Sequence, residues 1–529
     1  MTMNLQNFDD ANFDLDYLTW LIDEQAPPRQ RRFARLWEYF RNRQSPASGP
    51  LRRLENASTR PYMQGQEQGL PGRITGVDLS GSPLGGVARK EVVIENDIAW
   101  RIDTMIDFLF GRPVTVRSLA GDPDVASAVN AVLQAMWEAN GGAGFFQELA
   151  LYGSVYGFVD VALRTPADGT GEAVSALPAG AGRSADAGRR PGTPELSVSA
   201  GGALSERAVA RAVAAARRIS LEAIEAPRVV PVLSEDNCRR VRYWVQVYRK
   251  RCTRLAGGAK RWLHLPWTRS AERSPEEVEV VEILGRTWWQ RYENRRLLSE
   301  GPNPLATVPV VHIQNLALPG SYAGLGDVEP LLPLQDELNT RLSDRANRVT
   351  YQAFKMYLGK GIEDFLDRPV GPGQMWATSN TEATIEEFGS DAESPSEESH
   401  IEQVRRAMDK VSGVTPLAAG LIQGNVGHLT SATALKVLLA GVLSRTQRKR
   451  LTYGTGIARI AELALTWLNA SGAFRTTPDQ RRVEVNWPSP LPSDQQQELQ
   501  MARTKLDLGV PPARVLAELG YAETETPEN

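Results

Sequence analysis

The sequence predicts an α+β fold that is predominantly helical, and three observations support this. Apolar residues recur at helical spacing over long stretches, most clearly at 91–110, 327–354, 397–413 and 431–470. Alternation with a period of two, which is typical of strands, is confined to shorter stretches such as 241–248. Hydrophobic residues make up 42% of the 529 residues, which is enough to build cores in two or more sub-structures.

The composition excludes several classes of protein. The chain carries 60 Lys and Arg against 63 Asp and Glu, and this balance argues against binding nucleic acid over the whole surface. Cys238 and Cys252 are the two thiols, so a disulfide scaffold is excluded and no zinc motif is formed. No run approaches the 18 apolar residues of a membrane helix, and the acidic N-terminal stretch lacks an apolar signal core. We therefore expect an intracellular protein without a membrane partner.

A basic helix is predicted within an N-terminal arm that covers 1–60. Residues 29–43 place Phe33, Leu36 and Phe40 on one face at helical spacing. Two interpretations stay open at this point. The helix docks on its own fold or on a neighbouring copy, or it binds nucleic acid or an acidic partner.

The next part of the chain combines helices with short strands. A helix at 91–110 is expected to end at Gly111, and two further helices are predicted at 122–140 and 145–152. A strand at 156–163 follows them. Strands and helices are thus interleaved in one α+β unit.

Two segments within this part have unusual compositions. Residues 165–206 consist mainly of Ala, Gly, Ser and Pro without an aromatic residue, so we expect a mobile surface insertion. Residues 239–273 hold eleven Lys and Arg and one acid, a local charge of +10. This basic segment is either a solvated face or a contact surface for a polyanion or an acidic partner.

A long helix is predicted at 327–354, with Asp327 as its N-cap. Its apolar stripe consists of Leu331, Leu334, Leu338, Leu342 and Val349. At 1.5 Å per residue the helix is roughly 35–40 Å long.

A small β-containing segment at 355–396 follows this helix. Eight acids and no Lys or Arg lie between Glu382 and Glu402. The acidic segment is either a solvated linker or an acidic surface for a partner, and its candidate contact residues are Glu382, Glu386, Glu387 and Asp391.

Helix returns at 397–413, a neutral glycine-rich loop occupies 414–430, and a long helix follows at 431–470. The two glycines of Gly454-Thr455-Gly456 would permit a bend in this helix. Two helices that leave and return around a small insertion predict a protruding antiparallel hairpin. Such a protrusion typically packs beside copies of itself.

Motifs for catalysis or cofactor binding are not found in the sequence. There is no GxxxxGK[ST] loop for nucleotide phosphates, no GxGxxG after a strand and no HExxH pair. The four His residues are dispersed, and nothing apolar surrounds the paired carboxylates to separate their pKa values. We therefore predict a protein that is not an enzyme and that has no cofactor and no metal site.

The order of several motifs resembles the portal proteins of tailed bacteriophages over roughly 60–520. These motifs are the helix from Asn96 to Phe110 followed by Gly-Arg-Pro-Val, Pro309-Val-Val-His-Ile-Gln-Asn315, Asp327-Val-Glu-Pro-Leu331, Ser412-Gly-Val-Thr-Pro416, Ser431-Ala-Thr-Ala-Leu-Lys436, Val483-Glu-Val-Asn-Trp487 and Leu491-Pro-Ser-Asp494. Each motif alone is common, whereas their order and spacing are specific. The insertion 165–206 departs from the family pattern.

The resemblance implies a portal fold with wing, helical stem, small β-containing clip and helical crown, assembled as a ring that typically has twelve subunits. The regions it implies are an arm at 1–60, a wing at 61–325 with the insertion 165–206, a first stem helix at 326–354, a clip at 355–396, a second stem helix at 397–413, a tunnel loop at 414–430, a long wing helix at 431–470 and a crown at 471–529.

The resemblance also implies the function. Such a ring forms the channel at one capsid vertex through which double-stranded DNA is packaged and ejected, after assembly in the host cytoplasm. Its implied partners are further copies of itself, DNA, the terminase, the major capsid and scaffolding proteins, and the head-completion or connector proteins. The loop residues expected to face DNA are Gln423, Asn425 and His428, and the acidic clip residues are expected to meet a partner. Another ring-forming head-to-tail connector protein and an uncharacterised hydrolase are the alternatives.

Overall fold

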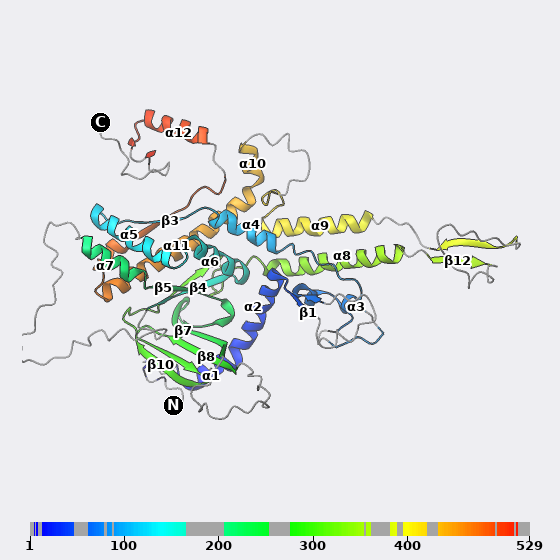
Figure 1. The fold of residues 1–529 in the computed structure, drawn as a ribbon, viewed down its shortest axis with the longest axis horizontal. Coiled ribbons are helices and arrows are strands. Elements are labelled where there is room, and N and C mark those ends of the chain that lie inside the picture. Colours follow the sequence, from blue (N-terminus) through cyan, green and yellow to red (C-terminus); the bar gives the residue numbers. More distant parts are fainter. Residues whose placement is uncertain are drawn as a thin grey trace, which may run out of the picture.

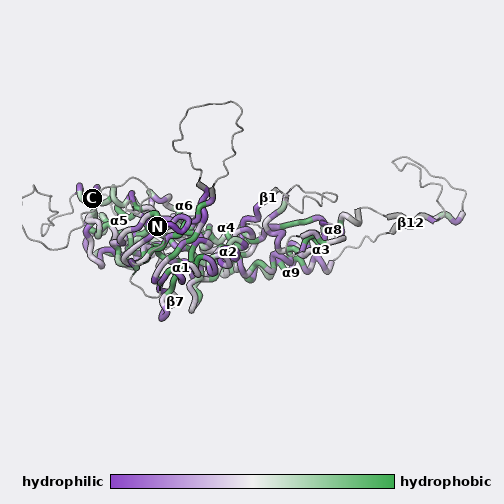
Figure 2. Tube along the Cα trace, turned by 90° about the horizontal axis from the view of Figure 1, so that it is seen from below, coloured by the Kyte–Doolittle hydropathy of each residue, from purple (hydrophilic) through white to green (hydrophobic). Residues whose placement is uncertain are grey.

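Two helices run side by side out of the body of the protein, and a small β-hairpin lies beyond their far ends (Figures 1 and 2). The computed structural model describes residues 5, 7–8, 13–46, 62–78, 82–86, 89–165, 206–252, 276–353, 356–360, 381–388, 395–420, 432–491, 495–512 and 515–516. The two interior segments with unusual compositions fall largely outside these residues, because 166–205 and 253–275 are not described.

The body is built on helices packed around a three-stranded antiparallel sheet. The sheet has the order β11 (Val310–Gln314), β4 (Phe158–Arg164), β5 (Ser220–Ile224). The helices that contribute to its core are α4 (Ala99–Phe110), α5 (Pro123–Ala139), α6 (Ala143–Tyr156), α7 (Glu206–Ala216) and α11 (Ala440–Ala470). Strand β3 (Thr115–Ser118) pairs with β14 (Val483–Asn486), so residues far apart in the sequence close this core.

A second, five-stranded antiparallel sheet lies beside the body. Its order is β10 (Arg296–Pro302), β9 (Trp288–Glu293), β8 (Glu276–Leu284), β7 (Asn237–Cys252), β6 (Val229–Ser234). Leu5, Phe8 and Phe13 are buried against this sheet together with Leu18 of α1 (Leu15–Trp20). The N-terminal residues therefore form a layer of the fold.

The basic helix predicted near the N-terminus is α2 (Ala26–Arg41), which follows a π-helical turn at Leu21–Gln25. Its Phe33, Leu36 and Tyr39 are buried, and Phe33 packs edge-on against Tyr156 with ring centroids 5.6 Å apart. The apolar stripe thus docks on the chain's own fold, as the first of the two interpretations proposed.

The protruding hairpin consists of α8 (Leu332–Ala353), which follows a 3-10 turn at Glu329–Leu331, and α9 (Pro395–Ser412). Ile401, Val404 and Met408 of α9 pack in one cluster with Leu338 of α8. Towards the far end the contacts become ionic, because Glu397 of α9 pairs with an arginine of α8. Val349, predicted in the apolar stripe, is 56% exposed, because the apolar contact ends before this residue.

The small β-hairpin beyond the helices is formed by β12 (Met356–Lys360) and β13 (Thr384–Phe388). They pair antiparallel, from Met356 opposite Phe388 to Lys360 opposite Thr384. The two strands predicted at the ends of 355–396 are therefore present, and the strand predicted at 374–377 lies outside the described residues.

The helix predicted to start at residue 91 starts at Ala99 instead. Residues 91–95 run along α8, where polar side chains at four-residue spacing bind their backbone. These side chains are Gln335, Asn339, Ser343 and Asn347. For example, Asn347 Oδ1 accepts from the Glu91 N–H at 3.0 Å and Asn347 Nδ2 donates to the Glu91 carbonyl at 3.0 Å. Because these side chains form hydrogen bonds with the backbone N–H and C=O groups of 91–95, these groups do not need partners within a helix.

The long helix predicted at 431–470 is present as two helices. The long helix is interrupted at Leu439, between α10 (Ala432–Leu438) and α11, and both glycines lie inside α11. A Cβ on Gly456 would lie 2.4 Å from Ile313 Cγ1, so this glycine lets α11 approach β11 closely. The C-terminal part adds the helix α12 (Gln495–Asp507). None of the described helices has both the length and the apolarity that crossing a membrane requires.

Candidate functional site

The glycine-rich loop at 414–430 is described at its first seven residues, and the next described residue after it is Ala432. The three predicted DNA-facing residues, Gln423, Asn425 and His428, lie outside the described residues. The site is therefore built from the elements that hold the two ends of the loop.

Arg101 of α4 binds the point where α9 ends and the loop begins. Its Nη1 lies 2.6 Å from Asp409 Oδ1 and 2.6 Å from the Val414 carbonyl oxygen. The same nitrogen is 3.2 Å from Ser412 Oγ, and Nη2 lies 2.9 Å from Asp97 Oδ2. One guanidinium thus connects α4, the last turn of α9 and the first loop residues.

This arginine is almost fully removed from solvent, with 2% of its surface exposed. Its guanidinium also lies over the Trp100 ring, 4.3 Å from the ring centroid. Burial raises the pKa of Asp409 above its ordinary value, and the hydrogen bond from Arg101 opposes that rise. Since a buried charge without its partner is strongly destabilising, Arg101, Asp97 and Asp409 hold the base of the loop in one arrangement.

Glycines allow the start of the loop to lie close to α11. Gly413 has a φ of +69°, which lets the chain turn sharply after α9. A Cβ on Gly441 would lie 3.3 Å from the Gly413 carbonyl oxygen, so α11 passes close to this turn. A groove of about 450 Å³ opens at the contact, with Lys410, Thr415 and Leu438 in its lining.

A second buried cluster joins the root of the hairpin to α11. Asp327 was predicted to cap a helix, but its carboxylate instead binds two cations of α11. Lys449 Nζ lies 2.5 Å from Asp327 Oδ2, and Arg445 Nη2 lies 2.6 Å from Oδ1. Ser154 Oγ lies 3.0 Å from Lys449 Nζ, and Asn315 Nδ2 donates to Asp327 Oδ2 at 3.0 Å.

This second cluster is as deeply buried as the first. Asp327 is 4% exposed and Lys449 is 1% exposed. Burial by itself raises the pKa of Asp327, but Lys449 and Arg445 outweigh it and bring the pKa to about 2. The carboxylate therefore stays ionised at neutral pH and fixes the start of the hairpin to the body.

The acidic clip residues are only partly placed. Glu382 is described and exposed, ahead of β13. Glu386 and Glu387 are residues of β13, in register with Leu358 and Tyr357 of β12. Asp391 lies outside the described residues.

The sequence did not identify Arg101 and Lys449 as residues that connect the hairpin and the loop to the body through buried ion pairs. The signal for Lys449 was present, because it occupies a position on the buried stripe of α11 between Thr446 and Tyr453. The signal for Arg101 was its i, i+4 spacing from Asp97 in an otherwise apolar region. A charged residue on an apolar stripe predicts a buried partner, but the sequence does not identify that partner.

Two observations concern the histidines and carboxylates of the described residues. His312 has both ring nitrogens engaged, with Nδ1 2.6 Å from Asp160 Oδ1 and Nε2 2.8 Å from the Tyr322 carbonyl oxygen. No group of three or more His, Cys, Asp or Glu that could bind a metal is found within the described part of the chain. The described residues thus form a base held by buried ion pairs under a projecting hairpin.

Comparison with known proteins identifies the family. The family model described as "Phage portal protein, SPP1 Gp6-like" matches residues 100–520. Similar solved structures include "Virion of native gene transfer agent (GTA) particle", with 12% identity, a TM-score of 0.40, and coverage of 80% of this chain and 89% of that one. "Neck of empty GTA particle computed with C6 symmetry" has 12% identity, a TM-score of 0.42, and coverage of 80% and 90%. No curated protein matches the sequence.

Because the family match spans most of the sequence, the chain belongs to the phage portal protein family. It is accordingly a structural component of the DNA-packaging head-to-tail connector of a virion, and it assembles with copies of itself as a ring.

Proposed function

We propose that the subunits form a ring of twelve at a single capsid vertex, with the loop 414–430 of each lining the narrowest part of the channel for double-stranded DNA. In this proposal α8 and α9 form the stem, 355–396 the clip, 61–325 and 431–470 the wing, and 471–529 the crown. The observation that carries the proposal is the pair of buried charge clusters at Arg101 and Asp327. They anchor the base of a projecting hairpin and of the loop that follows it.

The composition of the loop fits DNA that must move in both directions. Each cationic contact with DNA strengthens binding, and a duplex carries about one charge per 1.7 Å of axis. The loop 414–430 has no charged residue, so Gln423, Asn425 and His428 would offer only weak hydrogen bonds to the passing backbone. A channel lined in this way guides DNA without retaining it.

The acidic residues of the clip support a second part of the proposal. Glu382, Glu386, Glu387 and Asp391 would present a negative surface at the far end of the hairpin. This surface would repel the DNA backbone and bind partners such as the terminase and, later, the connector proteins. Contacts with the capsid and scaffolding proteins would be made by other surfaces during assembly in the host cytoplasm. The protein would have no catalytic activity of its own.

Cationic substitutions in the loop test this proposal. Changing Gln423 and Asn425 to Lys adds two cations per subunit, which makes about 24 in a ring of twelve, so DNA should be retained in the channel. We expect normal rings in end-on electron micrographs and a loss of genome packaging or ejection. Gln134→Lys, an exposed position on α5, is the matched control and should behave as the wild type. Normal DNA passage in the loop variant would overturn the assignment of the channel loop.

A further inference from the structure

Strand β11 is an edge strand with a free side. Among the strands that the structure describes, β4 alone pairs with it, at the end of the sheet order β11-β4-β5. The Leu163 N–H donates to the Pro309 carbonyl and the Asn315 N–H donates to the Gly157 carbonyl, each at 2.9 Å. Since bonding alternates along an antiparallel strand, the backbone groups of residues 310, 312 and 314 point to the other side, where no described strand pairs with them.

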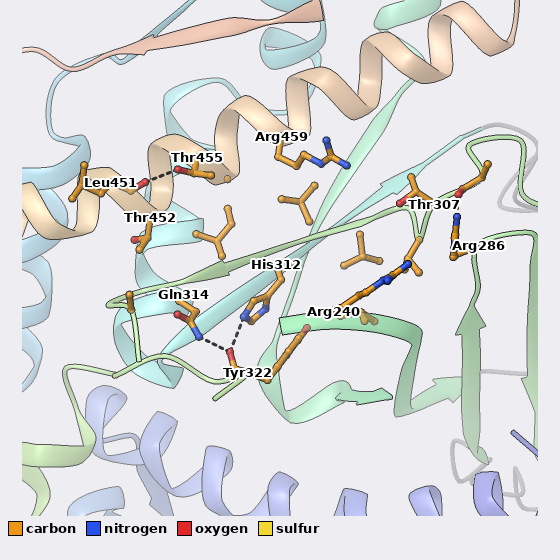
Figure 3. A pocket seen from close by; sticks show the side chains of 18 residues that line it. Arg240, Arg286, Thr307, His312, Gln314, Tyr322, Leu451, Thr452, Thr455 and Arg459 are labelled. Carbon is orange, nitrogen blue, oxygen red and sulfur yellow. Dashed lines mark hydrogen bonds between the residues drawn. The ribbon is translucent and has the colours of Figure 1, made fainter. Parts of the chain in front are cut away.

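A groove of about 780 Å³ runs along this free side (Figure 3). Leu451, Thr455 and Arg459 of α11 line one wall, and Arg240 lies on the opposite side. Much of the lining is apolar and comes from Val241, Val308, Val310, Val311 and Ile313. Leu451 is 65% exposed at this groove, although it is a large apolar side chain.

The charged side chains among the described residues of the groove are all positive. The described residues of its lining include Arg240, Arg286 and Arg459, and no Asp or Glu is among them. Arg459 is bound to Glu462 at 2.9 Å, and Arg286 Nε donates to the Ala306 carbonyl at 3.4 Å. Arg240 is exposed and has no ion pair with any described residue. An extended segment with carboxylates and a few apolar side chains would match both the edge strand and the arginines.

The C-terminal residues of this chain have that chemistry. Residues 517–529 carry four Glu and no Lys or Arg. In an extended conformation, Leu519, Tyr521, Glu523 and Glu525 share one face, with two apolar side chains followed by two carboxylates. Pro527 cannot donate a backbone hydrogen bond and is suited to the end of an added strand.

We propose that the C-terminal segment 517–529 adds as a strand to the free side of β11, with Glu523 and Glu525 facing the arginines of the groove. The added strand would cover the apolar lining and the exposed Leu451. This inference stands on the groove and the edge strand, and it is independent of the proposed channel loop. The described residues end at Leu516, just before the proposed strand.

Hydrogen exchange in the full-length assembled protein, resolved to peptides across 308–316, tests the proposal. In the wild type the backbone amides of this segment should be protected by the added strand. Glu523→Lys/Glu525→Lys should raise their exchange by about tenfold or more, because each lost backbone hydrogen bond contributes roughly 1 kcal/mol. Arg240→Glu/Arg459→Glu should do the same, and the two pairs combined should restore protection.

A matched control changes the same amount of charge elsewhere. Arg207→Glu/Arg211→Glu alters two exposed arginines of α7 and should leave exchange at 308–316 unchanged. Equal exchange in the wild type and in the C-terminal variant would overturn the proposal and indicate that another segment or protein covers β11. Failure of the combined variant to restore protection would also overturn it, since charge complementarity would then not direct the segment to this groove.

Discussion

Replacing Arg101 with Met should release the base of the loop while leaving the body folded. Met has a similar length and no hydrogen-bond donor, so the change removes the contacts with Asp409, Ser412 and the Val414 carbonyl. It also leaves the carboxylates of Asp97 and Asp409 without their shared cation.

The size of the effect follows from burial. Removing one partner of a buried ion pair destabilises by about 3–5 kcal/mol. The side chain of Asp409 is 23% exposed and reaches water once it is released, so the low end, about 3 kcal/mol, applies. At 1.36 kcal/mol per factor of ten, local opening at the end of α9 should become roughly 100-fold more frequent.

Hydrogen exchange of peptides covering 405–416 measures this opening. Arg405→Met is the control, because Arg405 lies on α9 itself and pairs with Glu95 at 2.7 Å while 35% of its side chain is exposed. A partly exposed pair of this kind contributes less than about 1 kcal/mol, so its loss should raise exchange less than about fivefold. If the two variants exchange equally, Arg101 does not hold the loop, and our explanation of the junction is refuted.

Three further predictions concern other parts of the chain. The pKa of Asp327 is about 2 in the folded protein, against an ordinary value of 3.8. The ionised carboxylate therefore stabilises the fold by about 2 kcal/mol above pH 4, and this contribution is lost as the pH falls to 2. Urea unfolding at several pH values should show this loss in the wild type and not in Asp327→Asn. Gly456→Val should lower the free energy of unfolding by about 1–3 kcal/mol through the clash with Ile313, whereas an unchanged melting temperature would show that α11 can move away. Deleting 170–200 should leave solubility and ring formation unchanged, because this Ala- and Gly-rich composition cannot bury much apolar area, and insoluble protein would contradict that.

Local signals in the sequence were reliable where neighbouring residues decide the structure. Asp122 was expected to begin a helix, and its Oδ1 accepts the Asp124 N–H at 2.9 Å at the start of α5. Gly413 was expected to end one, and it follows the last residue of α9 with a positive φ. Caps and stops of this kind involve residues a few positions apart, so they can be read without knowing the fold.

Predictions failed where a distant segment supplied the deciding contact. Residues 91–98 have a helical pattern, but side chains of α8 satisfy the backbone of 91–95 outside a helix. The sequence showed Gly456 only as one of two glycines that would permit a bend, and the side chain of Ile313 is what requires a glycine there. In both cases the partner lies more than 100 positions away in the sequence.

The sequence by itself determined the order of the helices, the hairpin with its small β insertion, the neutral loop and the resemblance to portal proteins. These follow from periodicity, caps and composition, which are local properties of the chain. Only the tertiary structure decided that Arg101 and Lys449 hold the junction and that β11 has a free side along a basic groove. The physical reason is that burying a charge requires a particular partner, and a linear pattern can show that a partner is needed without showing which residue provides it.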